Sequence, residues 1–351
     1  MVKLRTIELD PPLLNAACVW ASDLAQLTAL YDCPHTGGVT TRTATLGGFV
    51  EDGTHGVVFH REHRTTLNTY GYSPHPLRAY LAWTRVLLAR PPPPSCAPRK
   101  PVVVSVAASA PDELGEALGV IGEFLRAELG SAGERNVERV GVEVNVGCPN
   151  IREGDAADSH PGGALGGEVG ALEAFLRVVA DFFRSDGEVA LGVKLPPYTR
   201  ADDVRAVVRA LERVAGGGVC PVAWLVCTNT VGNAVLFGEE TCPPRADGSS
   251  ATNTNTFSPS PDETAAAPPR SGPGGLGGAA IHALALGNVV AFRAALDASS
   301  VQSVRDVVVV GAGGVDGPEA RRRMVSAGAG AVECASVLGW EGVGAFARIG
   351  G

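Results

Sequence analysis

Two residues that can carry out proton or charge chemistry each stand at the end of an apolar run. Cys148 lies in a Gly-Cys-Pro turn after residues 141–146, and Lys194 closes the run 190–194. A thiol in an accessible turn can be deprotonated and react, although most free cysteines are buried and inert. A buried ammonium needs an anionic partner, unless its stem carries the charge out to solvent. We therefore expect a reactive thiol at Cys148, and at Lys194 a cation that faces an anionic ligand.

Amide side chains also follow several of the apolar runs. Each amide alone is most often a turn former. Several of them near one face provide alternating hydrogen-bond donors and acceptors, which suits a ring with amide edges such as a cyclic imide. The set consists of Asn68, Asn145, Asn150, Asn229 and Asn233, with Gly71 in the same loop as the first.

The elements that position these residues are eight short apolar or β-branched runs that alternate with amphipathic segments of helical length. The predicted strands are residues 15–20, 38–43, 102–106, 141–146, 190–194, 222–227, 307–310 and 331–335. The predicted helices are residues 22–31, 76–88, 112–129, 168–183, 201–214, 279–296 and 318–327. Eight such units favour an α/β fold of the (β/α)8 TIM-barrel type, with an open, doubly wound sheet as the alternative.

A barrel of this type builds its site where the strands end, and its last two strands usually bind phosphate. Residues 311–314 (Gly-Ala-Gly-Gly) and Ala335-Ser336 follow those strands, and a helix begins near Pro318. Backbone N–H groups of such a turn, together with a helix start, can receive an anion. A tight turn without a ligand is the alternative. A dinucleotide site is disfavoured, because no G-x-G-x-x-G opens a helix.

Composition limits the class of protein and its partners. The chain has 351 residues, of which 45% are hydrophobic, and a net charge of −8 without a long basic cluster. It can bury a large core, and it lacks the positive footprint that nucleic acid or an anionic membrane requires. The charged first ten residues, the absence of 18 consecutive apolar residues and eight cysteines without a C-x-x-C pair predict a soluble, cytoplasmic protein with no metal site.

One stretch departs from the alternating pattern. The tract at about 239–273 is rich in Ser, Thr, Pro, Asn and Ala and almost free of apolar residues. Such a composition is typical of a mobile surface insertion. We therefore expect one barrel domain over residues 1–351 that carries this insertion between its sixth and seventh units.

Several segments, in their order along the chain, resemble the cytosolic, FMN-dependent class 1 dihydroorotate dehydrogenases, especially the homodimeric branch. The most distinctive are residues 145–150 (N-V-G-C-P-N) and 192–198 (G-V-K-L-P-P-Y). The others are residues 39–46, 68–71, 229–233, 274–278 and 311–315. Together these segments extend over nearly the whole chain. The resemblance implies a single FMN-binding (β/α)8 barrel.

The resemblance also assigns roles to the chemical residues. It implies that Cys148 removes the C5 proton of dihydroorotate while C6 delivers a hydride to flavin N5, and that Lys194 stabilises the reduced flavin. The implied substrate residues are Arg42, Asn68, Gly71, Asn145, Asn229 and Thr230. The implied cofactor residues are Ala17, Arg42, Thr43, Asn145, Lys194, Thr228, Gly278, Gly313, Gly314, Ala335 and Ser336.

The implied activity is oxidation of dihydroorotate to orotate in pyrimidine biosynthesis, by an oxidoreductase that acts on a CH–CH bond, with fumarate as acceptor and a homodimer as assembly. A cysteine base favours the cytosolic class, since the membrane-associated class resembles this chain but uses serine. Arg42 stands where the family has lysine, Gly147 replaces a serine, and Tyr70 and Tyr72 make the substrate loop more aromatic. Two alternatives follow: an FMN oxidoreductase of another cyclic amide or enoyl substrate, and a non-catalytic flavin-binding paralogue.

Overall fold

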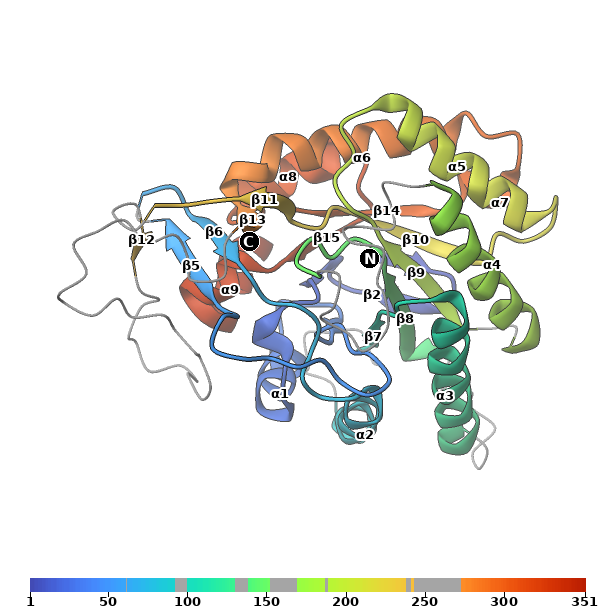
Figure 1. Cartoon of the computed structure of the whole chain (residues 1–351), viewed down its shortest axis with the longest axis horizontal. Helices are drawn as coiled ribbons and strands as arrows, with labels where there is room; N and C mark the ends of the chain where they lie inside the picture. The colour runs from blue at the N-terminus through green and yellow to red at the C-terminus, as the bar shows by residue number, and fades with distance from the viewer. Residues whose placement is uncertain are drawn as a thin grey trace.

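Eight parallel strands form the central sheet and follow one another around it in chain order (Figure 1). The computed structural model describes residues 1–60, 62–91, 100–129, 138–151, 169–186, 189–237, 241–242 and 273–351. Hydrogen bonds join the strands in the order β3-β15-β14-β10-β9-β8-β7-β4. The strands are β3 (Leu13–Asn15), β4 (Val39–Thr40), β7 (Val102–Val106), β8 (Val140–Asn145), β9 (Ala190–Lys194), β10 (Val222–Cys227), β14 (Val308–Ala312) and β15 (Ala331–Cys334). This arrangement confirms the predicted TIM barrel.

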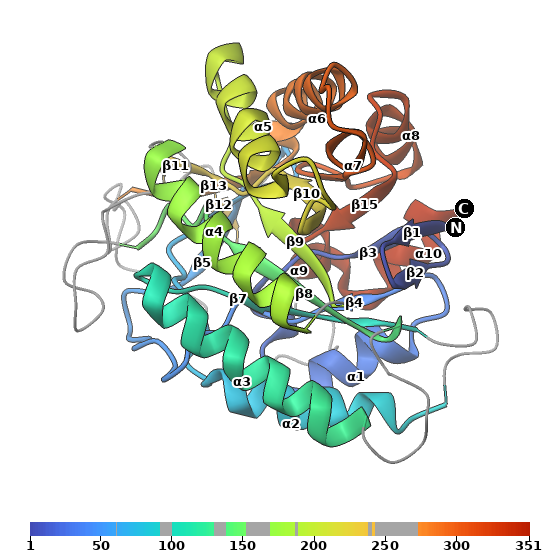
Figure 2. The same ribbon diagram turned by 90° about the vertical axis from the view of Figure 1, so that its right-hand side faces the viewer.

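Helices cover the outside of the barrel (Figure 2). The long ones are α1 (Leu24–Asp32), α2 (Leu77–Leu88), α3 (Pro111–Leu129), α4 (Val169–Asp186), α5 (Ala201–Ala215), α6 (His282–Asp297) and α8 (Pro318–Ser326). In α5, Val204, Val207, Val208 and Leu211 are buried at helical spacing, and Gly216 ends the helix with a left-handed φ of 55°. Each predicted helix therefore exists, with its ends shifted by no more than a few residues.

The short helical segments were not predicted, because each spans at most about two turns and shows no periodicity of its own. They are α7 (Gln302–Arg305), α9 (Ser336–Glu341), α10 (Ala345–Gly350) and the 3-10 turns η1 (Val19–Ala21) and η6 (Gly342–Gly344). A further 3-10 turn, η5 (Ala279–Ile281), forms the start of the predicted helix 279–296.

One helix in the described part of the chain, Ala279–Asp297, is long and apolar enough to cross a membrane by length and composition alone. In the fold it is an outer helix of the barrel. Ala285, Val289, Phe292 and Leu296 are buried on one side of it, at the spacing of a helix that packs on a core. One face of this helix therefore packs on the barrel, and 33% of its apolar window is buried.

Trp224 fills the barrel interior because neighbouring strands carry glycine where a side chain would collide with the indole. A Cβ on Gly192 would lie 1.9 Å from Trp224 Cε2, and a Cβ on Gly141 would lie 3.2 Å from its Cη2. The antiparallel hairpin of β1 (Val2–Leu4) and β2 (Ile7–Leu9) packs its apolar side chains into the same cluster. Its strands are too short to predict from alternation, yet they cover the N-terminal end of the barrel.

Asn15 joins the first and second barrel strands where the ladder of backbone hydrogen bonds is interrupted. Its Nδ2 donates to Thr40 O over 2.6 Å, and Thr40 N donates to Asn15 Oδ1 over 3.0 Å. Both residues are fully buried. The side-chain amide thus replaces the missing peptide pairing and closes the barrel between β3 and β4.

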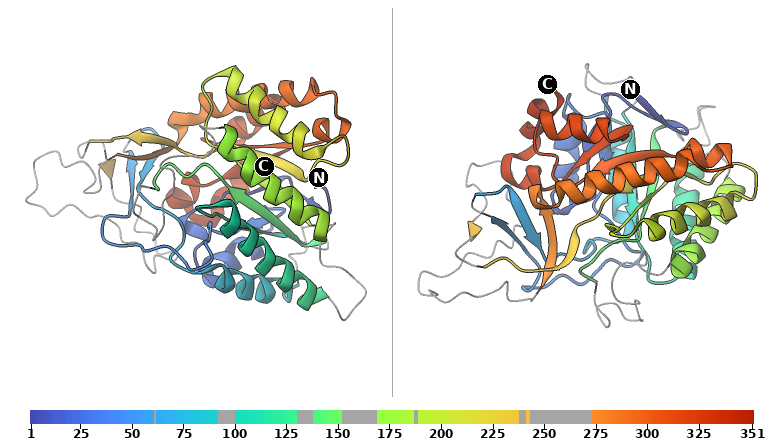
Figure 3. Two further views of the ribbon diagram at one scale, coloured as in Figure 1. Left: turned by 45° about the vertical axis from the view of Figure 1, so that its right-hand side comes forward. Right: turned by 90° about the horizontal axis from the view of Figure 1, so that it is seen from above.

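A second, antiparallel sheet lies to one side of the barrel (Figure 3). Its order is β11-β13-β6-β5-β12, with strands β11 (Val231–Ala234), β13 (Gly274–Gly278), β6 (Thr65–Asn68), β5 (Val57–His60) and β12 (Thr241–Cys242). β6 lies at the centre of this sheet and pairs with β13 and β5, which in turn pair with β11 and β12. This sheet was not predicted.

One predicted strand needs correction. The predicted first strand, residues 15–20, is wrong: the strand ends at Asn15, and the next residues enter the η1 turn.

The glycine-rich β13 forms a strand despite its low β-propensity, since the backbone of β6 passes too close for side chains; a Cβ on Gly274 would lie 2.5 Å from Asn68 O. Of the predicted insertion at 239–273, residues 241–242 pair with β5 and residue 273 is described, while 239–240 and 243–272 lie outside the described residues.

We expect Asn15→Ala to destabilise the barrel, because it leaves the N–H and C=O of Thr40 buried without partners. The free energy of unfolding should fall by about 2–6 kcal/mol, since each of the two orphaned buried groups costs about 1–3 kcal/mol. Urea denaturation followed by circular dichroism measures this. The exposed Gln302→Ala is the control, with a change below about 0.5 kcal/mol. An Asn15→Ala protein as stable as the control variant would contradict the role of this amide.

Candidate active site

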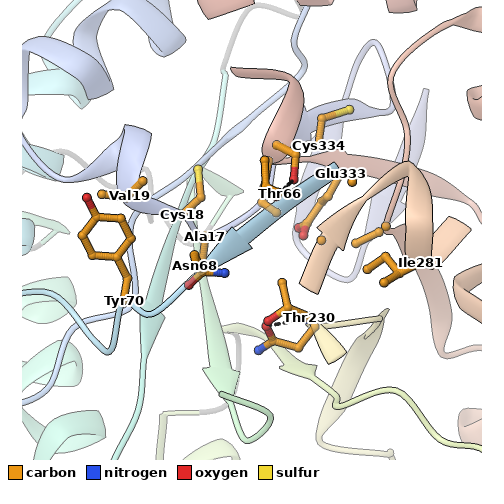
Figure 4. Close-up of a pocket in the computed structure, with 18 of the residues that line it drawn as sticks. Ala17, Cys18, Val19, Thr66, Asn68, Tyr70, Thr230, Ile281, Glu333 and Cys334 are labelled. Atoms are coloured by element: carbon orange, nitrogen blue, oxygen red, sulfur yellow. Dashed lines mark hydrogen bonds between the residues drawn. The ribbon is translucent and has the colours of Figure 1, made fainter. Parts of the chain in front are cut away.

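The carboxyl ends of the barrel strands and the second sheet enclose a cavity of about 150 Å³ (Figure 4). The residues to which the resemblance assigns a role all line it: Ala17, Arg42, Thr43, Asn68, Gly71, Asn145, Cys148, Lys194, Thr228, Asn229, Thr230, Gly278, Gly313, Gly314, Ala335 and Ser336. Asn150 lines it too, whereas Asn233 of β11 is exposed, has a positive φ of 58° and does not belong to the lining. Within the described ranges no group of three or more His, Cys, Asp or Glu is placed to hold a metal ion.

Asn145, the last residue of β8, is fixed by three hydrogen bonds. Its Nδ2 donates to Thr43 Oγ1 over 3.0 Å, and its Oδ1 accepts from Gly147 N and from Asn229 Nδ2, each over 3.1 Å. Thr230 N in turn donates to Asn229 Oδ1 over 2.8 Å. The amides at the ends of β8 and β10 therefore hold one another in place.

A second amide pair fixes the loop that follows β6. Asn150 Nδ2 donates to Asn68 Oδ1 over 2.9 Å, to Asn68 O over 3.0 Å and to Tyr70 O over 2.9 Å. Asn68 Nδ2 donates to Gly275 O over 3.1 Å. Asn150 thereby ties the turn that carries Cys148 to the loop that carries Asn68, a role that the sequence did not indicate.

Gly147 explains how the thiol comes close to the lysine strand. A Cβ at this position would lie 2.5 Å from Pro196 N, so the Cys148 turn can approach the end of β9 only with glycine at 147. Val146 N also donates to Lys194 O over 3.1 Å. The departure from the serine of the resembling family is thus a local packing requirement of this chain.

Cys148 is partly buried and packs against an apolar cluster that includes Tyr72. Burial raises the pKa of the Cys148 thiol above its ordinary value, because a thiolate loses solvation there. The backbone N–H of Asn150 and the cations of Arg42 and Lys194 act in the opposite direction. The thiol is protonated at rest and has stabilising groups around it for the moment when it ionises.

Lys194 is 5% exposed, and its charge interacts with two buried glutamates that the sequence reasoning missed. Glu143 precedes Asn145 on β8 by two residues, and Glu333 lies on β15. Burial raises the pKa of both carboxyls, and Lys194 opposes that rise. The sequence did carry a signal, namely a single acidic residue inside each of two otherwise apolar strands.

Arg42 lines the cavity, but its guanidinium is bonded to the protein around it. It donates to Glu51 Oε2 over 2.8 Å, to Tyr72 O over 3.1 Å and to Ser22 Oγ over 3.2 Å, and it lies 5.2 Å from the ring of Tyr70. Arginine can form several such bonds at once because its planar group presents a fixed fork of donors. Arg42 therefore clamps the aromatic loop, with Glu51 as a partner that the sequence did not reveal.

The other end of the cavity is formed by glycines and hydroxyls. Gly278, Gly313 and Gly314 have left-handed φ values of 75°, 125° and 67°, and a Cβ on Gly314 would lie 2.6 Å from the Cβ of His282. The hydroxyls of Thr66 and Ser336 lie 2.6 Å apart. Open backbone and hydroxyl donors of this kind suit a phosphate group.

Comparison with known proteins identifies a family and relatives of this chain. The family model described as dihydroorotate dehydrogenase matches residues 1–350. Proteins named dihydroorotate dehydrogenase (fumarate) from Trypanosoma cruzi and Lachancea kluyveri are 28% and 26% identical, and dihydroorotate dehydrogenase A (fumarate) from Lactococcus lactis is 26% identical. Each match covers 59% of this chain and 52% of the relative. The chain thus spans about half the length of the relatives it matches.

We expect the Arg42–Glu51 pair to couple the loop to the barrel. A double-mutant cycle with Arg42→Met and Glu51→Gln should give a coupling energy of at least about 1 kcal/mol, because the pair is largely removed from solvent. The exposed pair Arg184–Asp181, treated in the same way, should give no more than about 0.5 kcal/mol. Urea denaturation of the four proteins of each cycle provides the values. Equal coupling in the two pairs would show that the contact does not hold the loop.

Proposed function

This chain belongs to the dihydroorotate dehydrogenase family of flavin oxidoreductases, and on that premise we propose that it oxidises dihydroorotate to orotate with FMN as cofactor. The observation that supports this proposal best is the meeting of Cys148 and Lys194 in one cavity with amide side chains around it. A proton acceptor, a cation and a set of amide donors and acceptors are what oxidation of a cyclic imide requires.

The residues present fit an FMN group. Glycine backbone and the hydroxyls of Thr66 and Ser336 offer hydrogen-bond donors for a phosphate group. Lys194, in the same lining, offers a cation for the flavin ring. When bound, FMN supplies the two-electron acceptor for a hydride from the substrate. The chain's own contribution is to hold the ligands, to exclude water and to move the proton.

Cys148 is the proton acceptor in this proposal. Its thiolate takes the proton from C5 while C6 gives up its hydrogen with two electrons, so that a C5=C6 double bond forms and orotate results. The cations of Arg42 and Lys194 favour the thiolate, which offsets part of the cost of burial. Asn68, Asn229 and Thr230 line the cavity and suit the amide edges and the carboxylate of the substrate.

A second candidate substrate is another cyclic amide or an enoyl compound. It is favoured by Arg42, whose guanidinium is bonded to Glu51 and to the backbone of Tyr72, and by the aromatic ring of Tyr70 in the same loop. A cation that is already paired attracts a substrate carboxylate less strongly. Bleaching of bound flavin by dihydroorotate, dihydrouracil and simple enones, compared side by side, separates these substrates.

The remaining parts of the proposal concern acceptor, assembly and location. We propose fumarate as the acceptor, by likeness to relatives that carry fumarate in their names. We also propose a homodimer located in the cytoplasm. Analytical ultracentrifugation tests the dimer, and reoxidation of reduced protein by fumarate, followed at the flavin absorbance, tests the acceptor.

We expect Cys148→Ala to slow flavin reduction by dihydroorotate at least about a hundredfold, since a positioned base contributes typically 10²- to 10⁴-fold. The variant should still bind FMN. Anaerobic stopped-flow absorbance measures the reduction. Cys220→Ala is the control. It removes a buried thiol that precedes β10 and does not line the cavity, so this variant should reduce at the wild-type rate. Wild-type reduction by Cys148→Ala would refute the assignment of the base.

The same experiment has a pH dependence with a defined sign. Because burial raises the pKa of Cys148, the thiolate fraction and the reduction rate should increase as pH rises through the alkaline range. Cys148→Ala should lose this increase. A wild-type rate that falls over the same range would indicate a different proton acceptor.

A further inference from the structure

We propose that Glu333 is a protonated carboxylic acid that faces the proposed cofactor cavity, while Glu143 carries the single negative charge that balances Lys194. The three side chains form a buried set inside the barrel that the reaction described above does not use as acid or base. Glu143 is 0% exposed, Glu333 is 1% exposed and Lys194 is 5% exposed.

The strand register places these groups around one interior. Asn145 of β8 pairs with Lys194 of β9, so Glu143, two residues earlier, lies on the same face as the lysine. Glu333 projects from β15, which lies across the barrel from β8 in the strand order. Figure 4 shows the Glu333 carboxyl turned into the cavity while the sulfur of Cys334 beside it turns away.

Electrostatics decides how many protons the two carboxyls hold. Glu143 Oε1 and Glu333 Oε2 are buried, and neither has a hydrogen-bond partner in the described part of the chain. Two ionised carboxylates opposite one ammonium would leave a net negative charge without solvation, which is costly in an apolar interior. One proton on the pair makes the set of three neutral.

The partners of each carboxyl decide where that proton resides. Trp224 Nε1 lies 3.5 Å from Glu143 Oε2, and Lys194 is on the strand next to Glu143, so two groups stabilise its charge. Glu333 has no equivalent donor among the described residues. Burial raises the pKa of Glu333 well above its usual range, and the charge of Glu143 raises it further. The thiols of Cys18 and Cys334 are neutral as well, since burial raises the pKa of each.

The position of the proton matters for the cofactor, and this step rests on the proposed function. Glu333 lines the cavity and Glu143 does not. A neutral acid at Glu333 presents a hydrogen-bond donor to the cavity and adds no negative charge to its wall. An ionised Glu333 would place a negative charge beside a cofactor that becomes more negative when reduced, and would make its reduction harder. Glu333 is thus a residue that tunes the bound flavin.

The first test uses the ligand-free protein, so it does not depend on the proposed function. Infrared spectra at about pH 8, where exposed Asp and Glu are ionised, should show the C=O stretch of a protonated carboxylic acid, above the amide I band. The band should shift in D2O and disappear in Glu333→Gln. Its absence from the wild-type protein overturns the proposal, and this measurement needs no variant to fold. A band that persists unchanged in Glu333→Gln overturns the assignment to that residue.

The second test measures the midpoint potential of bound FMN in three isosteric variants. Glu333→Gln replaces one neutral group with another, so the potential should stay at the wild-type value. Glu143→Gln should lower it, because the charge that balances Lys194 then moves to Glu333 at the cavity wall. The double variant leaves Lys194 unbalanced and should raise it. A potential raised equally by each single variant would mean that both carboxylates are ionised, which overturns the proposal.

The two tests separate the possible failures. If the protein refuses FMN, the proposed function fails, while the infrared band still decides the protonation of Glu333. If FMN binds and the band is present, but Glu143→Gln leaves the potential unchanged, the acid is there without influence on the cofactor. That result overturns the tuning role alone.

Discussion

The burial of the Lys194 ammonium inside the barrel is the constraint to which the rest of the site responds. An ammonium among apolar strands is stable only if opposite charge lies near it. The glutamates that interact with it come from β8 and β15, two strands that face each other across the barrel. Glu143 lies on the strand paired with that of Lys194, so the balancing charge is local, whereas Glu333 reaches the same interior from β15, which pairs with the strand of Asn15.

Two glycines allow close contacts to the strand of Lys194, one just before the lysine and one just after it. Gly192 lets the indole of Trp224 lie against β9, and Gly147 lets the Cys148 turn lie against Pro196. Either contact would be lost with a side chain as small as alanine, because the Cβ would overlap its neighbour. The turn of Cys148 and the strand of Lys194 therefore pack directly against each other, which brings the thiol and the ammonium to one cavity.

The parts that sequence patterns predicted are those with local signals. The barrel followed from alternating apolar runs, and its site residues followed from their place at strand ends, which topology alone brings together. The Arg42–Glu51 contact and the Asn15–Thr40 bridge could not be predicted, since each joins positions that no periodicity relates. The β13 strand was missed for another reason. Glycine has a low intrinsic preference for strands, but here it is required because the backbone of β6 lies too close for a side chain.

The charges of the cavity are largely matched within the protein, and this determines how an anionic ligand can be recognised. Arg42 is paired with Glu51, and Lys194 with the buried glutamates. Recognition then depends on neutral donors. Asn68 and Asn229 each donate one amide N–H to the protein, to Gly275 O and Asn145 Oδ1. An amide nitrogen has a second N–H, and its direction is fixed by the bond that the first one makes. Because these donors are ordered before a ligand arrives, little side-chain entropy is lost on binding, which compensates for the weaker attraction of a neutral group.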